Sequence, residues 1–412
     1  MRPSWSLGPL REPRFGLLFA ARTTSSFGSA MANVALAFAV LDFGGPTDLG
    51  IVILAREVPT VILLLAGGVW SDRLPRHLVL VSSDTVRGLA QALTAGLLLT
   101  GHATLFTVAL LQVVYGAVNA FGRPAFQGVM PQIVRPARLQ QANALLGLSN
   151  SIVNIAGPAL GALVVAAAAP GWALAVDALT FGVSATLLVR LDLPRSLRLS
   201  GRSVLADFHE GWREFTSRSW LVAVVAGFGL FQLSFFPALL VLGPYVAKAS
   251  LGGPGAWGTI LAVQAAGSFA GGLVALRMHF ARPLVAVLVL VVPAGLLVLL
   301  LGLGASLWAI IGIAFAAGCG FAIGGAVWDS TLQTHIPEQS ISRISSFDWF
   351  GSVALNPIGY AVIGPLSDAI GVGECLLLAG LLNLGTTAAI LAIPSVRGLR
   401  SGRAAGTARE AA

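Results

Sequence analysis

Five acidic residues interrupt long apolar runs of this 412-residue chain, and a carboxylate in that setting can bind and release a proton. They are Glu57, Asp84, Asp177, Asp329 and Asp348. An ionised side chain at membrane depth is energetically unfavourable, so each of these residues is a functional candidate. Exposure of such a carboxylate to the two sides of a membrane in turn would move a proton across it.

Glu57 is the first candidate for a coupling proton. At about 1.5 Å per residue it lies roughly 12 Å below the predicted outer end of its helix, deeper than the other carboxylates. Its neighbour Arg56 points elsewhere, because adjacent helical residues do not face each other, so a partner such as Arg22 has to come from another helix. Asp84 and Arg87, near the inner end of the third run, can pair with each other.

The remaining carboxylates are predicted to lie near helix ends. Asp329 and Asp348, close to the inner boundary, could join a gate, whereas Asp177 is expected only to cap a helix or to accept a hydrogen bond. The predicted proton-coupling residues are therefore Glu57, Arg22, Arg56, Asp84, Arg87, Asp329 and Asp348.

Polar and aromatic stripes predict a substrate cavity. The first and fourth apolar runs carry polar residues at steps of three and four, which places them on one helix face. The seventh run has a phenylalanine face instead. The predicted cavity residues are Ser26, Ser29, Asn33, Gln112, Tyr115, Asn119, Arg123, Phe228, Phe231, Gln232, Phe235 and Phe315. Such a cavity suits an amphipathic organic molecule better than a sugar. A buried polar seam and aromatic packing within the bundle remain the alternatives.

A charged turn between two apolar runs predicts a gate and a duplication. It contains Gly67, Gly68, Asp72, Arg73 and Arg76, where glycines permit close helix approach and the charges can form a cluster at the membrane edge. Two glycines and an arginine recur in the same order about half a chain later, at residues 271–277. A second echo links residues 127–132 to residues 333–338. The chain is therefore predicted to use one unit twice.

The elements that must position these residues are membrane helices. Hydrophobic residues make up 56% of the chain, charged residues 10%, and the mean hydropathy is +0.86. Alternation with period two is absent, so strands are excluded. Twelve runs are long enough to span a bilayer, which needs about 20 residues each. They cover residues 15–41, 49–70, 78–99, 104–130, 139–168, 172–189, 220–247, 256–278, 284–303, 306–330, 344–366 and 374–393. The predicted fold is an all-α membrane protein of two pseudo-symmetric six-helix bundles.

Basic residues predict orientation and domains. The arginines outside the apolar runs all fall in the termini and in alternate loops, and the opposite loops carry only Lys248. Both termini are therefore predicted to be cytoplasmic. The expected domains are a six-helix bundle at 1–190, a cytoplasmic linker with an amphipathic helix at 191–219, a second bundle at 220–396 and a disordered basic tail at 397–412. Arginine used far more than lysine indicates a bacterial gene, hence a multi-pass protein of the inner (plasma) membrane.

Several function classes are excluded. The net charge of +8 comes from arginines dispersed among short loops, so nucleic-acid binding is not expected. The five histidines are scattered, and no nucleophile elbow or phosphate loop is present, which argues against an enzyme. Cys319 and Cys375 match no metal-ligand spacing. We expect no cofactor or metal, and a monomer whose partners are a small-molecule substrate, protons and the lipid bilayer.

The turn from Gly68 to His77 resembles the signature between helices two and three of the major facilitator superfamily, with Pro75 in place of a usual glycine. The resemblance implies that the turn holds a cytoplasmic gate in one state. The alternative is that Arg73 and Arg76 merely fix orientation. The superfamily's intramembrane arginine of helix four is not found at its usual depth. The possible substitutes are Arg22, Arg56, Arg87 and Arg123.

Residues Gly157, Pro158 and Gly161 resemble a motif of exporters within that superfamily, although Val153 and Ala162 replace two of its glycines. A kink or close packing is expected there, and ordinary small-residue packing is the alternative. The chain is most similar to the drug exporters related to macrolide and enterobactin efflux proteins. This resemblance implies proton-coupled export of a drug or antibiotic by alternating access around a midplane pocket. Uptake or exchange of a metabolite and export of a siderophore are the alternatives.

Overall fold

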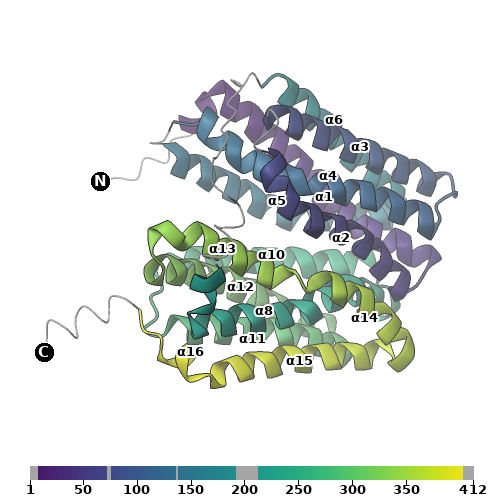
Figure 1. Cartoon of the computed structure of the whole chain (residues 1–412). Coiled ribbons are helices and arrows are strands. Elements are labelled where there is room, and N and C mark those ends of the chain that lie inside the picture. Colours follow the sequence, from purple (N-terminus) through teal and green to yellow (C-terminus); the bar gives the residue numbers. More distant parts are fainter. Residues whose placement is uncertain (1–7, 72–75, 136–137, 192–211, 402–412) are drawn as a thin grey trace, which may run out of the picture. The chain divides into compact units, whose positions relative to one another are not determined.

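The computed structural model describes residues 8–71, 76–135, 138–191 and 212–401, which form helices and short connections with no strand in those ranges. The chain divides into two compact units, residues 1–200 and residues 201–412 (Figure 1). Gly67 and Gly68 lie near the end of a helix, whereas Asp72 and Arg73 of the predicted gate lie outside the described residues.

Unit 1 contains six long helices after a short 3₁₀ turn at Gly8–Arg11. They are α1 (Pro13–Phe43), α2 (Pro46–Ser71), α3 (Arg76–Leu99), α4 (Leu105–Ile133), α5 (Leu139–Ala167) and α6 (Pro170–Val189). Prolines in the first turn of α1 and α6 are well placed, because their missing N–H would have no helical partner there. Thr104 and Thr107 form a reciprocal capping box that begins α4.

Unit 2 has the same order of long helices, with more interruptions. They are α8 (Ser219–Pro237), a π-helical turn (Ala238–Leu242), α9 (Gly243–Val246), a second π-helical turn (Ala247–Leu251), α10 (Pro254–Ala275), α11 (Pro283–Gly302), α12 (Leu307–His335), α13 (Glu338–Val353), α14 (Asn356–Ile370), α15 (Val372–Ala392) and α16 (Pro394–Gly398). Ser306 caps α12 at the position where Thr104 caps α4, and both helices have 29 residues.

Helix pairing repeats between the units, as expected for a duplicated bundle. In unit 1, α1 packs on α5 and α6, α2 packs on α4, and α3 packs on both α4 and α6. In unit 2, α8 packs on α13, α14 and α15, α10 packs on α12, and α11 packs on both α12 and α15. Each pair of unit 1 thus has a counterpart in unit 2. The predicted all-α fold of two pseudo-symmetric bundles is confirmed.

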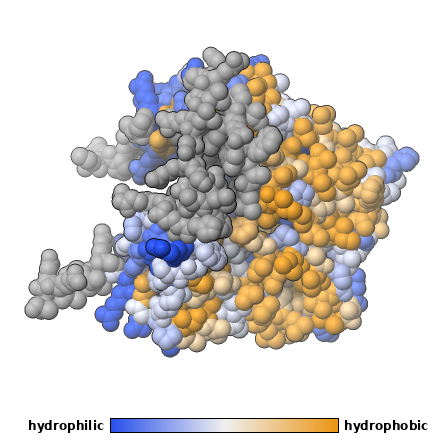
Figure 2. Space-filling view, viewed as in Figure 1, coloured by the Kyte–Doolittle hydropathy of each residue, from blue (hydrophilic) through white to orange (hydrophobic). Residues whose placement is uncertain are grey.

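The molecule presents the surface of a membrane protein. Large apolar side chains such as Ile62, Leu89, Phe106, Leu179 and Trp308 are exposed along the helices. Figure 2 shows broad hydrophobic areas on the visible face. Exposed apolar surface of this extent is rare in soluble monomers and is typical of contact with lipid.

Ten segments of the described residues are long and apolar enough to cross a membrane. Together with α2 and α3 they account for the twelve predicted helices. These two helices have 26 and 24 residues, and they carry several of the candidate charges.

Two of the predicted helices are less regular than expected. The seventh span contains two π-helical turns, one directly after Pro237 and one after Pro244. Each proline lacks the N–H that a regular α-helical turn uses. The eleventh span is interrupted between α13 and α14, just before Pro357. Pro357 has no N–H to bond the carbonyl oxygen of Val353, and its ring would clash with that carbonyl in a continuous helix, which explains this position.

Of the predicted linker at 191–219, the structure describes Leu191 and residues 212–219. Its aromatic residues Trp212 and Phe215 pack on Phe347 of α13, with ring centroids 5.6 and 5.9 Å apart respectively. The end of this segment is therefore attached to unit 2.

Candidate functional site

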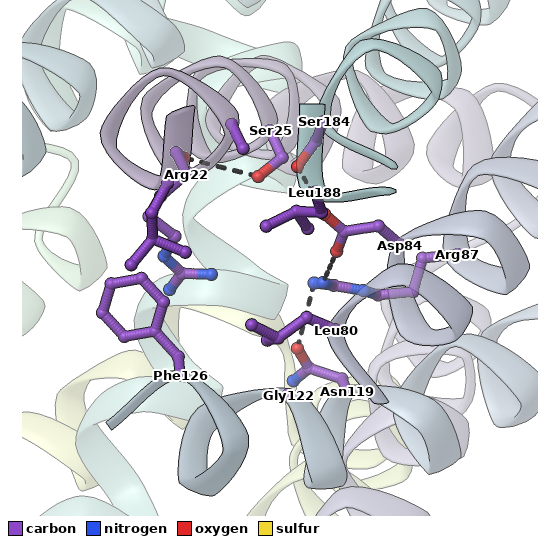
Figure 3. A pocket seen from close by; sticks show the side chains of 12 residues that line it. Arg22, Ser25, Leu80, Asp84, Arg87, Asn119, Gly122, Phe126, Ser184 and Leu188 are labelled. Carbon is purple, nitrogen blue, oxygen red and sulfur yellow. Dashed lines mark hydrogen bonds and ion pairs between the residues drawn. The ribbon is translucent and has the colours of Figure 1, made fainter. Parts of the chain in front are cut away.

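A polar cavity of about 270 Å³ lies inside unit 1, enclosed by α1, α3, α4 and α6 (Figure 3). Its lining residues are Leu18, Ala21, Arg22, Ser25, Leu80, Asp84, Arg87, Asn119, Gly122, Phe126, Ser184 and Leu188. They come from the first halves of α1 and α3 and the second halves of α4 and α6. Because successive membrane helices run in opposite directions, these halves lie at one end of the bundle. We call this the cavity end.

An ion pair between Asp84 and Arg87 forms one wall of the cavity. The two residues are almost fully buried, at 4% exposure for Asp84 and 6% for Arg87. The hydroxyl of Ser184 donates a hydrogen bond to the second oxygen of Asp84. Arg87 also donates to Asn119 Oδ1 at 3.3 Å and to the carbonyl oxygen of Ser83 at 3.4 Å. A buried ion pair is tolerated when its remaining donors and acceptors are satisfied in this way.

Arg22 contributes a second guanidinium to the cavity. In Figure 3 the guanidinium groups of Arg22 and Arg87 point into the same space from opposite sides. The Arg22 guanidinium lies 5.3 Å from the ring centroid of Phe126, and Ser25 donates to the Arg22 carbonyl oxygen at 3.3 Å. The cavity therefore borders two cations and one carboxylate, a setting that water and small polar species can enter.

Two aromatic rings lie next to the ion pair, away from the cavity. The Arg87 guanidinium lies 4.5 Å from the ring centroid of Phe181 and 5.8 Å from that of Tyr115. The two rings meet edge to face at 6.0 Å. Arg56 of α2 also lies over Tyr115, at 4.6 Å, and donates to Asn33 Oδ1 at 2.9 Å. Two cations thus share one tyrosine ring by cation–π interaction.

Beyond these rings, Asp177 of α6 is completely buried. Its carboxylate accepts hydrogen bonds from Gln91 Nε2 at 2.7 Å and from the Ser29 hydroxyl at 3.2 Å. Gln112 Nε2 in turn donates to Gln91 Oε1 at 3.5 Å. The Ser29 hydroxyl also lies 3.5 Å from the hydroxyl of Tyr115. The direct partners of Asp177 are therefore neutral, in contrast to those of Asp84.

Gln112 has an unmet hydrogen-bonding requirement. The residue is 1% exposed, and its Oε1 atom has no partner in the described part of the chain. Buried carbonyl oxygens are nearly always satisfied by protein or by ordered water. This oxygen is therefore a place where a water molecule would be stabilised, next to Gln91 and Asp177.

The structure groups only part of the predicted proton-coupling set. Asp84, Arg87 and Arg56 belong to the series of polar and aromatic contacts that leads from the cavity to Asp177, which we call the polar column. Arg87 lies near the middle of α3, further from the helix end than expected, because that helix already begins at Arg76. Glu57 is half-buried on α2 and makes no hydrogen bond or ion pair with any described residue. Asp177, in contrast, is completely buried and lies at the centre of a hydrogen-bonded network.

Sequence reasoning undervalued Asp177. It was expected near a helix end, yet it lies close to the middle of α6. Gln91 of α3, which positions it, was not singled out at all. The available signal was the occurrence of Asp177 and Gln91 within predicted membrane helices, where unpaired polar groups are unfavourable.

Several of the predicted cavity residues of unit 1 take part in the buried contacts described above. Ser29, Gln112 and Tyr115 belong to the buried network, and Asn119 bonds Arg87. Ser26 is half-buried on α1. The side chains of Arg76 and Arg123 lie outside the described part of the structure. The buried polar seam considered as an alternative thus describes much of this set.

In unit 2 the predicted phenylalanine face forms an aromatic cluster. Phe231 and Phe235 are buried, with ring centroids 5.2 Å apart, and both contact Phe321 of α12 at 6.3 and 5.4 Å. Phe228 stacks on Phe231 at 5.7 Å. Phe321 was not predicted. The structure thus places these rings in packing between α8 and α12, whereas Phe315 is exposed.

The polar groups within this bundle are mainly neutral. Gln232 donates to the carbonyl oxygen of Ser352 at 2.9 Å, and Asn383 donates to the Ser234 hydroxyl at 3.0 Å. Near the end of α12, Trp328 Nε1 donates to Asp348 Oδ2 at 3.0 Å. Asp329 on the same helix is exposed.

The glycines of α5 provide close packing. Gly157 and Gly161 lie on its buried face, and a Cβ atom on Gly161 would come within 2.6 Å of the carbonyl oxygen of Met31 in α1. Gly157 similarly contacts Ala30 of α1. The helix continues through Pro158 without a break. The close packing expected for this motif is therefore present in the structure.

Comparison with known proteins agrees with this architecture. A family model described as the Major Facilitator Superfamily matches residues 18–360. The enterobactin exporter EntS of Shigella boydii serotype 18 is 27% identical over 390 residues, which cover 90% of this chain and 91% of the exporter. The uncharacterized MFS-type transporter YkuC of Bacillus subtilis is 26% identical over 332 residues, 75% of each protein.

Among solved structures, the nucleoside transporter NupG has a TM-score of 0.76 at 10% identity and covers 92% of this chain and 99% of its own. A bacterial homologue of the iron transporter ferroportin, in an inward-facing state, has a TM-score of 0.71 at 16% identity and covers 94% of this chain and 100% of its own. At these identities the likeness shows the fold alone.

The duplicated helical bundle, its apolar surface and its buried charges define a multi-pass membrane transporter, not an enzyme. The chain belongs to the Major Facilitator Superfamily, as its family match over most of its length shows. The resemblance expected from the sequence is confirmed, and the relatives include an exporter.

Proposed function

We propose that this protein exports an amphipathic organic molecule across the bacterial inner membrane in exchange for protons. The observation that carries the proposal is the buried polar column of unit 1, in which Asp84, Arg87 and Asp177 lie close to the middle of membrane helices. Ionisable groups in that position are energetically unfavourable and are typical of proton pathways in transporters.

The direction and the substrate class are supported by different features. The Gly157 and Gly161 packing against α1 belongs to the motif that resembles exporters, and the relative EntS is named as an exporter of enterobactin. The aromatic groups of unit 2, including the exposed Phe315, favour a ligand with a substantial apolar surface.

Export of a siderophore is the second candidate. It is favoured by the similarity to EntS over 90% of this chain. An aromatic siderophore would satisfy the same mixture of aromatic and polar groups, so the two candidates differ mainly in the charge and size of the ligand. A substrate comparison can separate them.

Everted membrane vesicles provide the test of direction and coupling. When respiration acidifies their lumen, an exporter coupled to protons should accumulate ethidium, a lipophilic cationic dye, and part of the pH gradient should be consumed. Vesicles from cells with an empty vector are the control. Adding an uncoupler should release the accumulated dye. Dye uptake that is equal in both preparations, or that persists without the gradient, would exclude proton-coupled export of this dye.

Growth assays extend the test to the substrate class. Cells that express the protein should tolerate higher concentrations of several lipophilic antibiotics than control cells. If they instead secrete more siderophore with no change in antibiotic tolerance, the second candidate is favoured.

The proposal also includes a cytoplasmic gate and the placement of both termini in the cytoplasm. The gate is formed by Gly67, Gly68, Asp72, Arg73 and Arg76.

A further inference from the structure

We propose that Asp84 and Asp177 form a two-station proton relay inside unit 1, in which Arg87 neutralises one carboxylate at a time. The relay gives the proton a route through one bundle. Its role in coupling rests on the proposed function, but the proton sites themselves do not. The evidence is the order of the groups, their charge balance and the hydroxyl groups that contact each carboxylate.

The two carboxylates lie in series along the bundle. Asp84 lines the polar cavity at the cavity end (Figure 3). Asp177 comes from the first half of α6, whereas the cavity uses the second half of that helix, so it lies further from the cavity end. Arg87, Tyr115 and Phe181 lie between them, as their mutual contacts show. A proton that enters by the cavity would reach Asp84 first.

Charge balance distinguishes the two stations. Asp84 is paired with Arg87, whereas Asp177 accepts hydrogen bonds only from Gln91, Ser29 and Thr180 among the described residues. A carboxylate without a contacting cation is unfavourable as an anion in a buried site and is stabilised by binding a proton. With Arg87 on Asp84, the favoured location of one proton is therefore Asp177.

The charged and titratable groups around Asp177 come from three helices. They are Arg56 of α2, Arg87 of α3 and Tyr115 of α4, while α5 has no ionisable residue and α6 has none besides Asp177 itself. Arg56 is engaged with Asn33 and the Tyr115 ring. Arg56 and Arg87 both interact electrostatically with Asp177, and Arg87 is the one of the two that also pairs with Asp84. A rotation of its side chain is therefore the simplest switch.

Because Arg87 can pair with only one carboxylate at a time, only one of Asp84 and Asp177 holds the proton at a time. If Asp84 binds a proton, its pairing with Arg87 is lost and the guanidinium can turn toward Asp177, which then releases its proton. The reverse rotation restores the state seen here. Two carboxylates that share one cation titrate as a coupled pair, which holds one proton between them.

Each station has neutral hydroxyl groups beside it that can pass a proton to or from the carboxylate. Ser29 donates to Asp177 and lies beside the Tyr115 hydroxyl, and Ser184 donates to Asp84. In a transfer along hydroxyls, each oxygen accepts one proton and gives up its own, so only O–H bonds form and break. The unpartnered oxygen of buried Gln112 adds a water position on the far side of Asp177. This position extends the column away from the cavity end.

Infrared spectroscopy of the full-length protein in lipid nanodiscs tests the relay without any organic substrate. The carbonyl stretch of a protonated carboxylic acid, read at pH 7, reports a proton on a buried carboxylate. We expect this band in the unmodified protein and its loss in Asp177→Asn. We also expect its loss in Asp84→Asn, because the released Arg87 then pairs with Asp177 and keeps it ionised. Arg87→Gln should retain the band and strengthen it, since both carboxylates then lack their cation.

The loss in Asp84→Asn is the decisive result, because a simple removal of an ion-paired carboxylate would leave the band unchanged. Retention of the band in that variant would overturn the switch. A band that disappears in Glu57→Gln but persists in Asp177→Asn would overturn the assignment of the station. Asp42→Asn, at the exposed end of α1, is the control for removal of one carboxylate. The double variant Asp84→Asn/Arg87→Gln, which removes both charges, should show the band if the protein is folded.

The result is separable from the proposed function. Vesicles that fail to accumulate dye with a pH gradient would contradict proton-coupled export, while the infrared pattern would still establish the relay. Conversely, gradient-driven export with no change in the band in Asp84→Asn would place the coupling proton elsewhere.

Discussion

Removal of the Asp84 charge should destabilise the protein because Arg87 would keep its own. In Asp84→Asn the buried Arg87, which is 6% exposed as a residue, loses the anion that it contacts. Breaking a buried ion pair by removing one partner costs about 3–5 kcal/mol. We expect about 3 kcal/mol, the lower end, because Arg87 borders a cavity that water can enter and, in the relay proposed above, turns toward Asp177.

A loss of about 3 kcal/mol is roughly a hundredfold change in the folding equilibrium, since each 1.4 kcal/mol is a factor of about ten. Reversible unfolding by SDS in mixed micelles, followed by tryptophan fluorescence, can measure it. Arg87→Gln alone leaves Asp84 without its cation, so the buried carboxyl group has to bind a proton, and this variant should also be destabilised. The double variant Asp84→Asn/Arg87→Gln has no buried charge at this pair. Its loss of unfolding free energy should therefore be smaller than the sum of the losses in the two single variants.

The double variant also supplies the refutation. If its stability equals the sum of the two single losses, Asp84 and Arg87 do not stabilise each other and the ion pair has no energetic role. If Asp84→Asn unfolds like the unmodified protein, the reasoning from burial is wrong for this site.

Three other perturbations have outcomes that the structure and the sequence predict. Gly161→Val should lower the free energy of unfolding by about 1–3 kcal/mol through overpacking against α1, whereas Gly147→Ala, with open space around it, should be neutral or slightly stabilising in the same SDS titration. Phe231→Ala should cost about 3 kcal/mol because its buried ring contacts are lost, and a stability equal to that of the unmodified protein would contradict its role in packing. In a background without native cysteines, His102→Cys and His279→Cys should react with a membrane-impermeant maleimide from opposite sides of the membrane, and labelling from the same side would refute the predicted topology.

The two units divide the polar chemistry between them. In the described residues, the ion pair and the buried aspartate of unit 1 contrast with the neutral amides Gln232 and Asn383 of unit 2. The repeated helix pairing shows that both units have the same architecture. The difference therefore lies in the side chains placed on a common scaffold. It is consistent with one unit handling protons and the other contributing apolar surface for the substrate, as we propose.

The helices themselves could be predicted closely. The predicted run at 139–168 corresponds to α5 (Leu139–Ala167), and that at 284–303 to α11 (Pro283–Gly302). Composition is enough for this, because a bilayer leaves a chain no other means of satisfying its backbone groups over about 20 apolar residues. The π-helical turns and the break before Pro357 were missed because the apolar pattern continues through them.

The site could be predicted only in part. The pairing of Asp84 with Arg87 could be predicted, because side chains three residues apart in a helix lie next to each other. The contacts of Asp177 with Gln91 and Ser29 join three helices that are far apart in the chain. No spacing within one helix contains that information, and Glu57 therefore ranked first on depth alone.

The amino-acid sequence by itself determined the membrane environment, the helix count, the duplication and the family, since these follow from hydropathy and from local motifs. Which buried carboxylate has a cation and which has only neutral partners was decided by the tertiary structure. The reason is physical: the energy of a buried charge depends on what contacts it, and those contacts are set by the packing of α1, α3, α4 and α6.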